Sequence, residues 1–135
     1  MYKNVLVPIV FDDDHDASDA IEIAKAISAD GASITLLHVM DEIPSYALSY
    51  LSDEYLTNAR LAIVTEMEKM VSDVENGHAD VVNGHSGRTI LEYADEKKND
   101  CIVITSHTPG MQDYLLGSTA SKVVRHAKCS VHVVR

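Results

Sequence analysis

The chain has 135 residues, enough for one hydrophobic core without help from metals or disulfides, and this length excludes a two-domain enzyme. Hydrophobic residues make up 46% and charged residues 24%, which is the composition of a folded domain and not of a disordered segment. Eleven Lys and Arg against 21 Asp and Glu give a formal net charge of -10, so a general role in binding nucleic acid or anionic membrane surfaces is excluded.

In the first half of the chain, short apolar runs alternate with segments of helical periodicity. Residues 5–10 predict a first strand, and a helix follows over residues 17–27, which Gly31 is suited to end. Residues 33–39 predict a second strand. An irregular insertion with room for a short helix comes next, and an apolar stripe from residue 63 to residue 74 predicts a longer helix.

The second half repeats the alternation. A weaker third strand over residues 79–82 breaks at Gly84, and Ser86 can cap the helix that follows it. The remaining predicted elements are a fourth strand at 101–104, a helix opening at Gly117-Ser118 and a fifth strand at 130–134. Strands that alternate with helices in this way predict a parallel sheet covered by helices, with a ligand crevice at the carboxyl ends of the strands.

Two polar segments near the end of the chain could hold an anion. One is the turn-rich stretch 104–110 that leaves the fourth strand, and the other is Gly117-Ser118-Thr119 at a helix start. Amides in the first turn of a helix lack internal partners and lie at the positive end of its dipole, so they suit a phosphate. A plain helix cap explains the same residues, and their spacing does not decide between the two readings.

The most acidic run, residues 12–16, suggests a metal site at first sight. Its spacing imitates the first ligands of a calcium loop, but Ala17 replaces the required Gly and Ile23 replaces the closing Glu. A phosphoacceptor receiver domain also fails, because no Asp ends the third strand and no Lys follows the fifth. We interpret Asp13 and Asp14 as a solvated acidic loop before a helix.

The histidines and cysteines show no metal-binding spacing. His38 and His132 fall within predicted strands and are interpreted as structural, whereas His107 could either bond a phosphate oxygen or fix its turn. Two cysteines, Cys101 and Cys129, fit a reducing compartment and a role as small buried hydrophobes. With no apolar signal or membrane-spanning run, we expect a cytoplasmic protein.

Several segments spread over the chain resemble the universal stress protein family. They are Val-Leu-Val-Pro at 5–8, Gly-His-Ser at 84–86, Val-Ile-Thr-Ser-His-Thr at 103–108, Tyr-Leu-Leu-Gly-Ser at 114–118, and the stretch 123–135. Nucleotide-binding members of that family carry Gly-x2-Gly-x9-Gly-Ser/Thr. This chain has Thr105 and Thr108 at the first two glycine positions and one residue fewer before Gly117. Its Ser-His-x-Pro form is similar to the nucleotide-binding F and G subgroup.

The resemblance implies a fold, a site and an assembly. The fold is a single α/β domain over residues 1–135, with a Rossmann-like five-stranded parallel sheet in the order 3-2-1-4-5 and helices on both faces. The first-strand loop would meet adenine and ribose, Val39 would contact adenine through its backbone, and Gly84 would lie near the ribose. The full set of implied nucleotide-binding residues is Pro8, Ile9, Val10, Asp12, Val39, Gly84, Ser106, His107, Thr108, Gly117, Ser118 and Thr119.

The function implied by the resemblance is an ATP-binding regulatory module of the stress response with little or no turnover, since the sequence holds no Walker Lys and no catalytic nucleophile motif. Mg²⁺ could accompany ATP, with Asp12 as its candidate contact. Two alternatives stay open: a nucleotide-free dimeric interaction protein, and a slow ATPase that uses Asp12. The resemblance also implies a homodimer formed through residues 130–135.

Overall fold

The computed structural model describes residues 1–11, 17–106 and 116–135. The elements follow in chain order: β1 (Tyr2–Pro8), α1 (Ser18–Ile27), β2 (Ser28–Met40), α2 (Ser45–Leu48), α3 (Asp53–Met70), β3 (Gly77–Asn83), α4 (Ser86–Glu96), β4 (Cys101–Thr105), α5 (Ser118–His126) and β5 (Ser130–Val134). In these ranges no helix is long and apolar enough to cross a lipid bilayer.

The described strands form one parallel sheet in the order β3-β2-β1-β4-β5, which confirms the predicted topology. β1 lies at its centre, where Val7 pairs with Leu36 of β2 and Leu6 pairs with Ile102 of β4. The chain winds in one direction from β1 to β3 and in the other from β4 to β5. The point of reversal therefore lies between β1 and β4, where an open α/β sheet leaves a crevice beyond the carboxyl ends of its strands.

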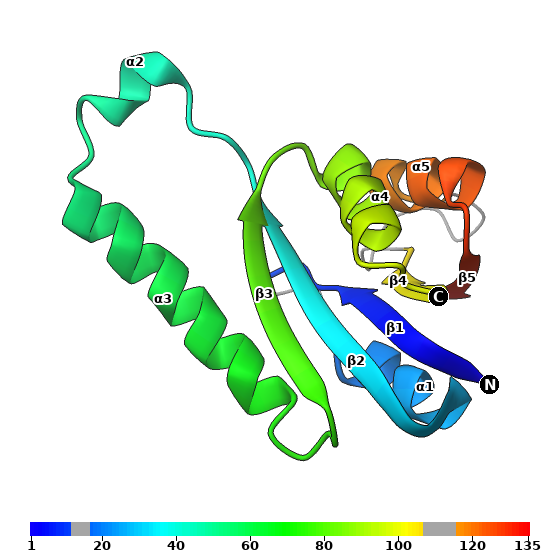
Figure 1. Cartoon of the computed structure of the whole chain (residues 1–135). Helices are drawn as coiled ribbons and strands as arrows, with labels where there is room; N and C mark the ends of the chain where they lie inside the picture. Colours follow the sequence, from blue (N-terminus) through cyan, green and yellow to red (C-terminus); the bar gives the residue numbers. More distant parts are fainter. Residues whose placement is uncertain (12–16, 107–115) are drawn as a thin grey trace.

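Both faces of the sheet are covered, because the central strands are apolar on both sides (Figure 1). Val5 and Val7 of β1 face α1 and α3, where Met67 is completely buried. Leu6, which points to the opposite face, packs with Ile102 and with residues of α4 and α5. The two helix layers thus hold the sheet between them and fix the positions of their own amino-terminal ends.

The boundary between the first helix and the second strand lies earlier in the chain than the sequence predicts. We expected Gly31 to end the helix, but α1 ends at Ile27 and β2 begins at Ser28. The helix ends at Ser28 because its backbone is extended, with φ -85° and ψ 142°. Its amide donates to the Lys25 carbonyl oxygen, and its hydroxyl donates to the Ala24 carbonyl oxygen at 2.5 Å. Gly31 instead lies inside the strand with φ +77°, a conformation that favours glycine.

Two other helices begin or end differently from the prediction. α3 already begins at Asp53, where the Ser52 hydroxyl accepts a hydrogen bond from the Tyr55 amide at 3.0 Å, and Val74 lies beyond its end. α2 is the expected short helix of the insertion, and in Figure 1 it stands well away from the sheet. Ser86 does not cap α4, because it is the first helical residue and His85 occupies the cap position.

The first strand is also shorter at its carboxyl end than residues 5–10 predict. β1 stops at Pro8, although the Ile9 amide still donates to the Leu37 carbonyl oxygen at 2.8 Å. Val10 is 55% exposed and has left the sheet. Val10 therefore lies in the wall of the crevice and not in its floor.

Candidate functional site

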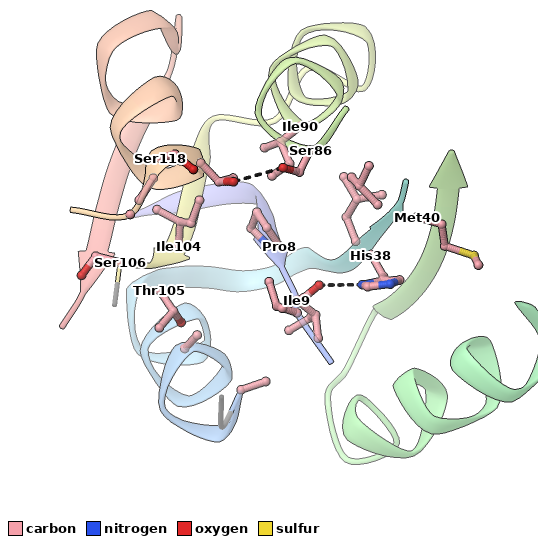
Figure 2. A pocket seen from close by; sticks show the side chains of 18 of the residues that line it. Pro8, Ile9, His38, Met40, Ser86, Ile90, Ile104, Thr105, Ser106 and Ser118 are labelled. Atoms are coloured by element: carbon pink, nitrogen blue, oxygen red, sulfur yellow. Dashed lines mark hydrogen bonds between the residues drawn. The ribbon is translucent and has the colours of Figure 1, made fainter. Parts of the chain in front are cut away.

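A cavity of about 640 Å³ lies at the carboxyl ends of β1, β2 and β4, where α1, α4 and α5 begin (Figure 2). This volume is within the range of small-molecule binding sites. Helix amino-terminal ends carry partial positive charge, so the three helices favour a ligand with negative charge. None of the lining residues that the structure describes is Lys or Arg, and an anion would therefore be held there by neutral donors.

The cavity brings together most of the residues proposed from the sequence. Those that line it are Pro8, Ile9, Val10, Val39, Ser106, Gly117, Ser118 and Thr119. Gly84 does not line it: its amide donates to the Met40 carbonyl oxygen at 2.9 Å at the end of β3, and its φ is +154°. Its place near a ribose stays a prediction. Asp12, His107 and Thr108 lie outside the described residues.

Ser106 ties the end of β4 to two other elements. Its amide and its hydroxyl both approach the Val134 carbonyl oxygen, at 3.0 and 3.3 Å, and its own carbonyl oxygen accepts from the Gly117 amide at 2.8 Å. The side chain is 2% exposed. Because the hydroxyl proton is used within the fold, Ser106 positions the start of α5 beside β4, and its predicted contact with phosphate stays a prediction.

Among the described residues, the start of α5 supplies backbone donors to the cavity. Gly117 is the N-cap and no side chain caps the helix, so the amides of Ser118, Thr119 and Ala120 have no intrahelical acceptor. The Thr119 hydroxyl lies 3.0 Å from the Ser86 hydroxyl at the start of α4 (Figure 2). Two helix starts therefore meet at one wall of the cavity, joined by a pair of hydroxyl groups.

The opposite side of the cavity is built from the ends of β1 and β2. Ile9 is 4% exposed, and its carbonyl oxygen lies 2.9 Å from Nδ1 of His38 (Figure 2). The imidazole also meets the Phe11 ring edge to face, with 5.1 Å between the ring centroids. His38 thus makes a structural contact through Nδ1, in line with its interpretation from the sequence, and it also lines the cavity beside Val39.

Sequence reasoning missed several residues of the wall. They are Ala17, His38, Met40, Asp41, Ser86 and Ile90. Ala17 and Ser86 stand at helix starts. His38, Met40 and Asp41 lie around Val39 at the end of β2. The useful signal was position: residues at the carboxyl ends of parallel strands and at the first turn of the next helix share one edge of the sheet.

The thiols are not nucleophiles for this site. Burial raises the pKa of the Cys101 thiol to about 11, and burial also raises the pKa of the Cys129 thiol. Both therefore stay protonated near neutral pH, as their interpretation as inert residues requires. Neither lines the cavity. In the described part of the chain no cluster of His, Cys, Asp or Glu has the arrangement of a metal site.

A second cavity of about 430 Å³ lies at the other end of the α4 and α5 layer. Its wall includes Leu91, Ala94, Ile102 and Cys129, together with charged side chains at the ends of the two helices. None of the residues proposed from the sequence lines it. It lies at the carboxyl ends of α4 and α5, where the helix dipoles carry partial negative charge, so these helix ends do not favour an anionic ligand as the helix starts of the first cavity do.

Comparisons with known proteins agree on one family. The model of the universal stress protein family matches residues 1–135. Universal stress protein G of Escherichia coli O157:H7 is 30% identical over 142 residues, covering all of both chains. The solved structure of the hypothetical protein MJ0577 has a TM-score of 0.79 and 26% identity over 99% of this chain and 96% of that one. The universal stress protein UspA from Lactobacillus plantarum has a TM-score of 0.73 and 29% identity over 99% and 98%.

Structures of the same fold at lower identity have been solved with adenine nucleotides. A universal stress protein in complex with cAMP is 21% identical, with a TM-score of 0.72 over 99% of this chain and 97% of that chain. The universal stress protein of Archaeoglobus fulgidus in complex with dAMP is 18% identical, with a TM-score of 0.65 over 99% and 98%.

Proposed function

The chain belongs to the universal stress protein family, and from this membership and the geometry of the 640 Å³ cavity we propose that it is an adenine-nucleotide-binding regulatory module. ATP is the proposed ligand, with Mg²⁺ as its companion. The observation that carries the proposal is the convergence of uncapped helix starts and an apolar strand end on one cavity. A nucleotide needs both of these, because it has an anionic end and a flat, largely apolar base.

The anionic end fits the α5 wall. The first-turn amides of Ser118 and Thr119 and the Ser118 hydroxyl are donors that no other described residue uses, and Gly117 carries no side chain that would fill the space in front of them. With no Lys or Arg among the described lining residues, this wall is suited to reversible binding. Reversible binding is the behaviour that a sensor of nucleotide concentration needs.

The base fits the β1 and β2 wall. Pro8, Ile9 and Val10 supply apolar surface, and the backbone of Val39 supplies a donor and an acceptor at the end of a strand. Such a pair matches the ring nitrogen and the exocyclic amino group of adenine, whereas guanine presents a donor and an acceptor in the opposite order. We therefore propose selectivity for adenine over guanine nucleotides.

We propose little or no turnover. The described lining residues that could move a proton are His38, whose Nδ1 is bound to the Ile9 carbonyl oxygen, and Asp41. Efficient phosphoryl transfer needs positioned cations around the phosphates. The regulatory effect would come from tighter binding of nucleotide to one conformation of the protein than to another. Nucleotide would then increase the population of that conformation, and partners would bind to its surface. A cytoplasmic location stays a prediction, which cell fractionation would test.

Calorimetry on the purified protein tests the ligand. We expect saturable binding of AMP and of ATP with Mg²⁺, and affinity for GTP roughly 5- to 150-fold weaker, because mismatched donors and acceptors cost about 1–3 kcal/mol. ADP release should stay at the level of a blank without protein. Absence of heat at millimolar ATP would contradict the proposal and favour a nucleotide-free interaction protein. ADP release in proportion to protein would favour the ATPase alternative.

We also propose a homodimer formed through β5, because the two edges of the sheet differ. At the β3 edge, the Arg60 guanidinium of α3 donates to the Val81 carbonyl oxygen and to the Asn83 side chain. Arg60 thus uses the Val81 carbonyl oxygen, which is an acceptor on the outer side of this edge strand. β5 forms the opposite edge and presents half-buried Val131 and Val133. A second copy that pairs with this edge would cover it in an isologous contact.

A proline at the edge of β5 tests the dimer. Because the Val134 carbonyl oxygen faces β4 and accepts the Ser106 amide, the amide of the preceding residue, Val133, faces away from β4. Val133→Pro removes that outward donor and leaves the pairing with β4 intact. Light scattering should show a dimer for the wild type and for Val133→Thr, and a folded monomer for Val133→Pro. A folded dimer of the proline variant would contradict pairing through β5.

A further inference from the structure

The end of the β1–β2 ladder is irregular at the residue where the cavity begins. The last paired residues are Pro8 and Leu37, and the Ile9 amide then donates to the Leu37 carbonyl oxygen at 2.8 Å. A parallel ladder that continued by one bond would direct the Val39 amide to the Ile9 carbonyl oxygen. In the described part of the chain that bond is not formed, and the Val39 amide has no partner.

The Ile9 carbonyl oxygen is occupied by a side chain instead. Nδ1 of His38 lies 2.9 Å from it, and a carbonyl oxygen can only accept, so the neutral imidazole carries its proton on Nδ1. The Phe11 ring packs against the imidazole at an interplanar angle of 78° and limits its rotation. His38 therefore holds the first residue after β1 by a side-chain bond at the position where the strand would have used a backbone bond.

We propose that His38 is a positioning residue for the ligand site: its hydrogen bond holds the Ile9 carbonyl oxygen out of line with the ladder and so keeps the Val39 amide unpaired and available to the base. This inference rests on the proposed function, because it assigns to one side chain the donor on which adenine recognition depends. His38 acts through Val39 and through the wall formed by Ile9, so it needs no contact with the ligand. Without the hydrogen bond from His38, the Val39 amide can donate to the Ile9 carbonyl oxygen, and the β1–β2 ladder gains one hydrogen bond.

The substitutions His38→Phe and His38→Asn separate this role from simple packing. Phenylalanine keeps an aromatic ring against Phe11 but has no donor for Ile9. Asparagine loses the ring, yet its Nδ2 is attached to Cγ as Nδ1 of histidine is, so it can donate to the same carbonyl oxygen. His132→Asn is the matched control, since His132 is an exposed histidine on β5 that does not line the cavity.

Amide hydrogen exchange, measured by NMR on the protein without nucleotide, reads the bond directly. In the wild type, in His38→Asn and in His132→Asn, the Val39 amide should exchange fast compared with the Leu37 amide inside the ladder. In His38→Phe, we expect the Val39 amide to become protected, because it gains the Ile9 carbonyl oxygen as acceptor. A substitution that only loosened the structure would make exchange faster at this position, not slower.

Calorimetry with AMP supplies the second reading. His38→Phe should weaken binding about tenfold, the effect of losing one hydrogen bond, and should reduce the preference for adenine over guanine nucleotides. His38→Asn and His132→Asn should bind as the wild type does. Wild-type affinity in His38→Phe, or a Val39 amide already protected in the wild type, would overturn the proposal. If the wild type binds no nucleotide, the proposed function fails, and the exchange rates alone still decide the role of His38.

Discussion

Gly117→Val should reduce affinity for adenine nucleotide at least about tenfold, because its side chain enters the space in front of the α5 donors, and loss of one or more charge-assisted hydrogen bonds is worth roughly 1.5–3 kcal/mol. Gly117 has φ -62° and ψ 159°, an extended conformation that any residue adopts. A Cβ atom at this position would lie 3.3 Å from the Ser106 carbonyl oxygen, a tight contact that a shift of a few tenths of an ångström relieves. We therefore expect the variant to fold with a small loss of stability.

Gly117→Ala is the graded control for this substitution. Its single methyl group should weaken binding less than the valine does, and both variants should unfold at nearly the wild-type denaturant concentration, since replacing a glycine N-cap costs about 1 kcal/mol or less. Calorimetry gives the affinities and circular dichroism gives the unfolding curves. Undiminished affinity in a folded valine variant would show that the anionic end of the ligand lies elsewhere.

Leu6→Ala should lower the free energy of unfolding by about 2–5 kcal/mol, which is a large part of the stability of an ordinary domain. Leu6 is completely buried in the central strand, where it packs with Ile102 of β4 and with α4 and α5. Truncation leaves a cavity beneath the helix layer that the parallel strands on either side cannot fill.

Leu61→Ala is the matched control, because Leu61 on α3 is 59% exposed and the same atoms are removed. Urea unfolding of this variant should differ from the wild type by less than about 0.5 kcal/mol. Equal stabilities for the two alanine variants would contradict the assignment of the sheet's central strand to the core.

The sequence predicted the sheet well because both faces of its central strands are covered. Residues such as Val5, Leu6 and Val7 form a continuous apolar run, and such runs separated by helical periodicity leave few ways to wind a chain. The boundary at Ser28 could not be predicted from periodicity, since the apolar pattern does not show where the backbone turns extended. Gly31 was a plausible helix end by composition but lies within the strand.

The candidate site was predictable in part for the same topological reason. Ser118 and Thr119 could be proposed because a helix start after a strand is a local pattern in the sequence. His38 and Ser86 could be placed at this edge by their positions in the sequence, but their hydrogen-bond partners, Ile9 and Thr119, lie far along the chain and could not be predicted. The apolar pattern of a strand indicates which residues face each side of the sheet. It does not indicate where a side chain replaces a backbone amide as the hydrogen-bond donor at the end of the strand.

The most direct test of the central claim is a titration of the isotopically labelled protein with AMP, followed by amide chemical shifts. Saturable shifts should concentrate at Val39, Gly117, Ser118 and Thr119, on the two walls of the 640 Å³ cavity. Saturable shifts concentrated at Leu91 and Cys129 of the second cavity, or no saturable shifts at all, would contradict the account.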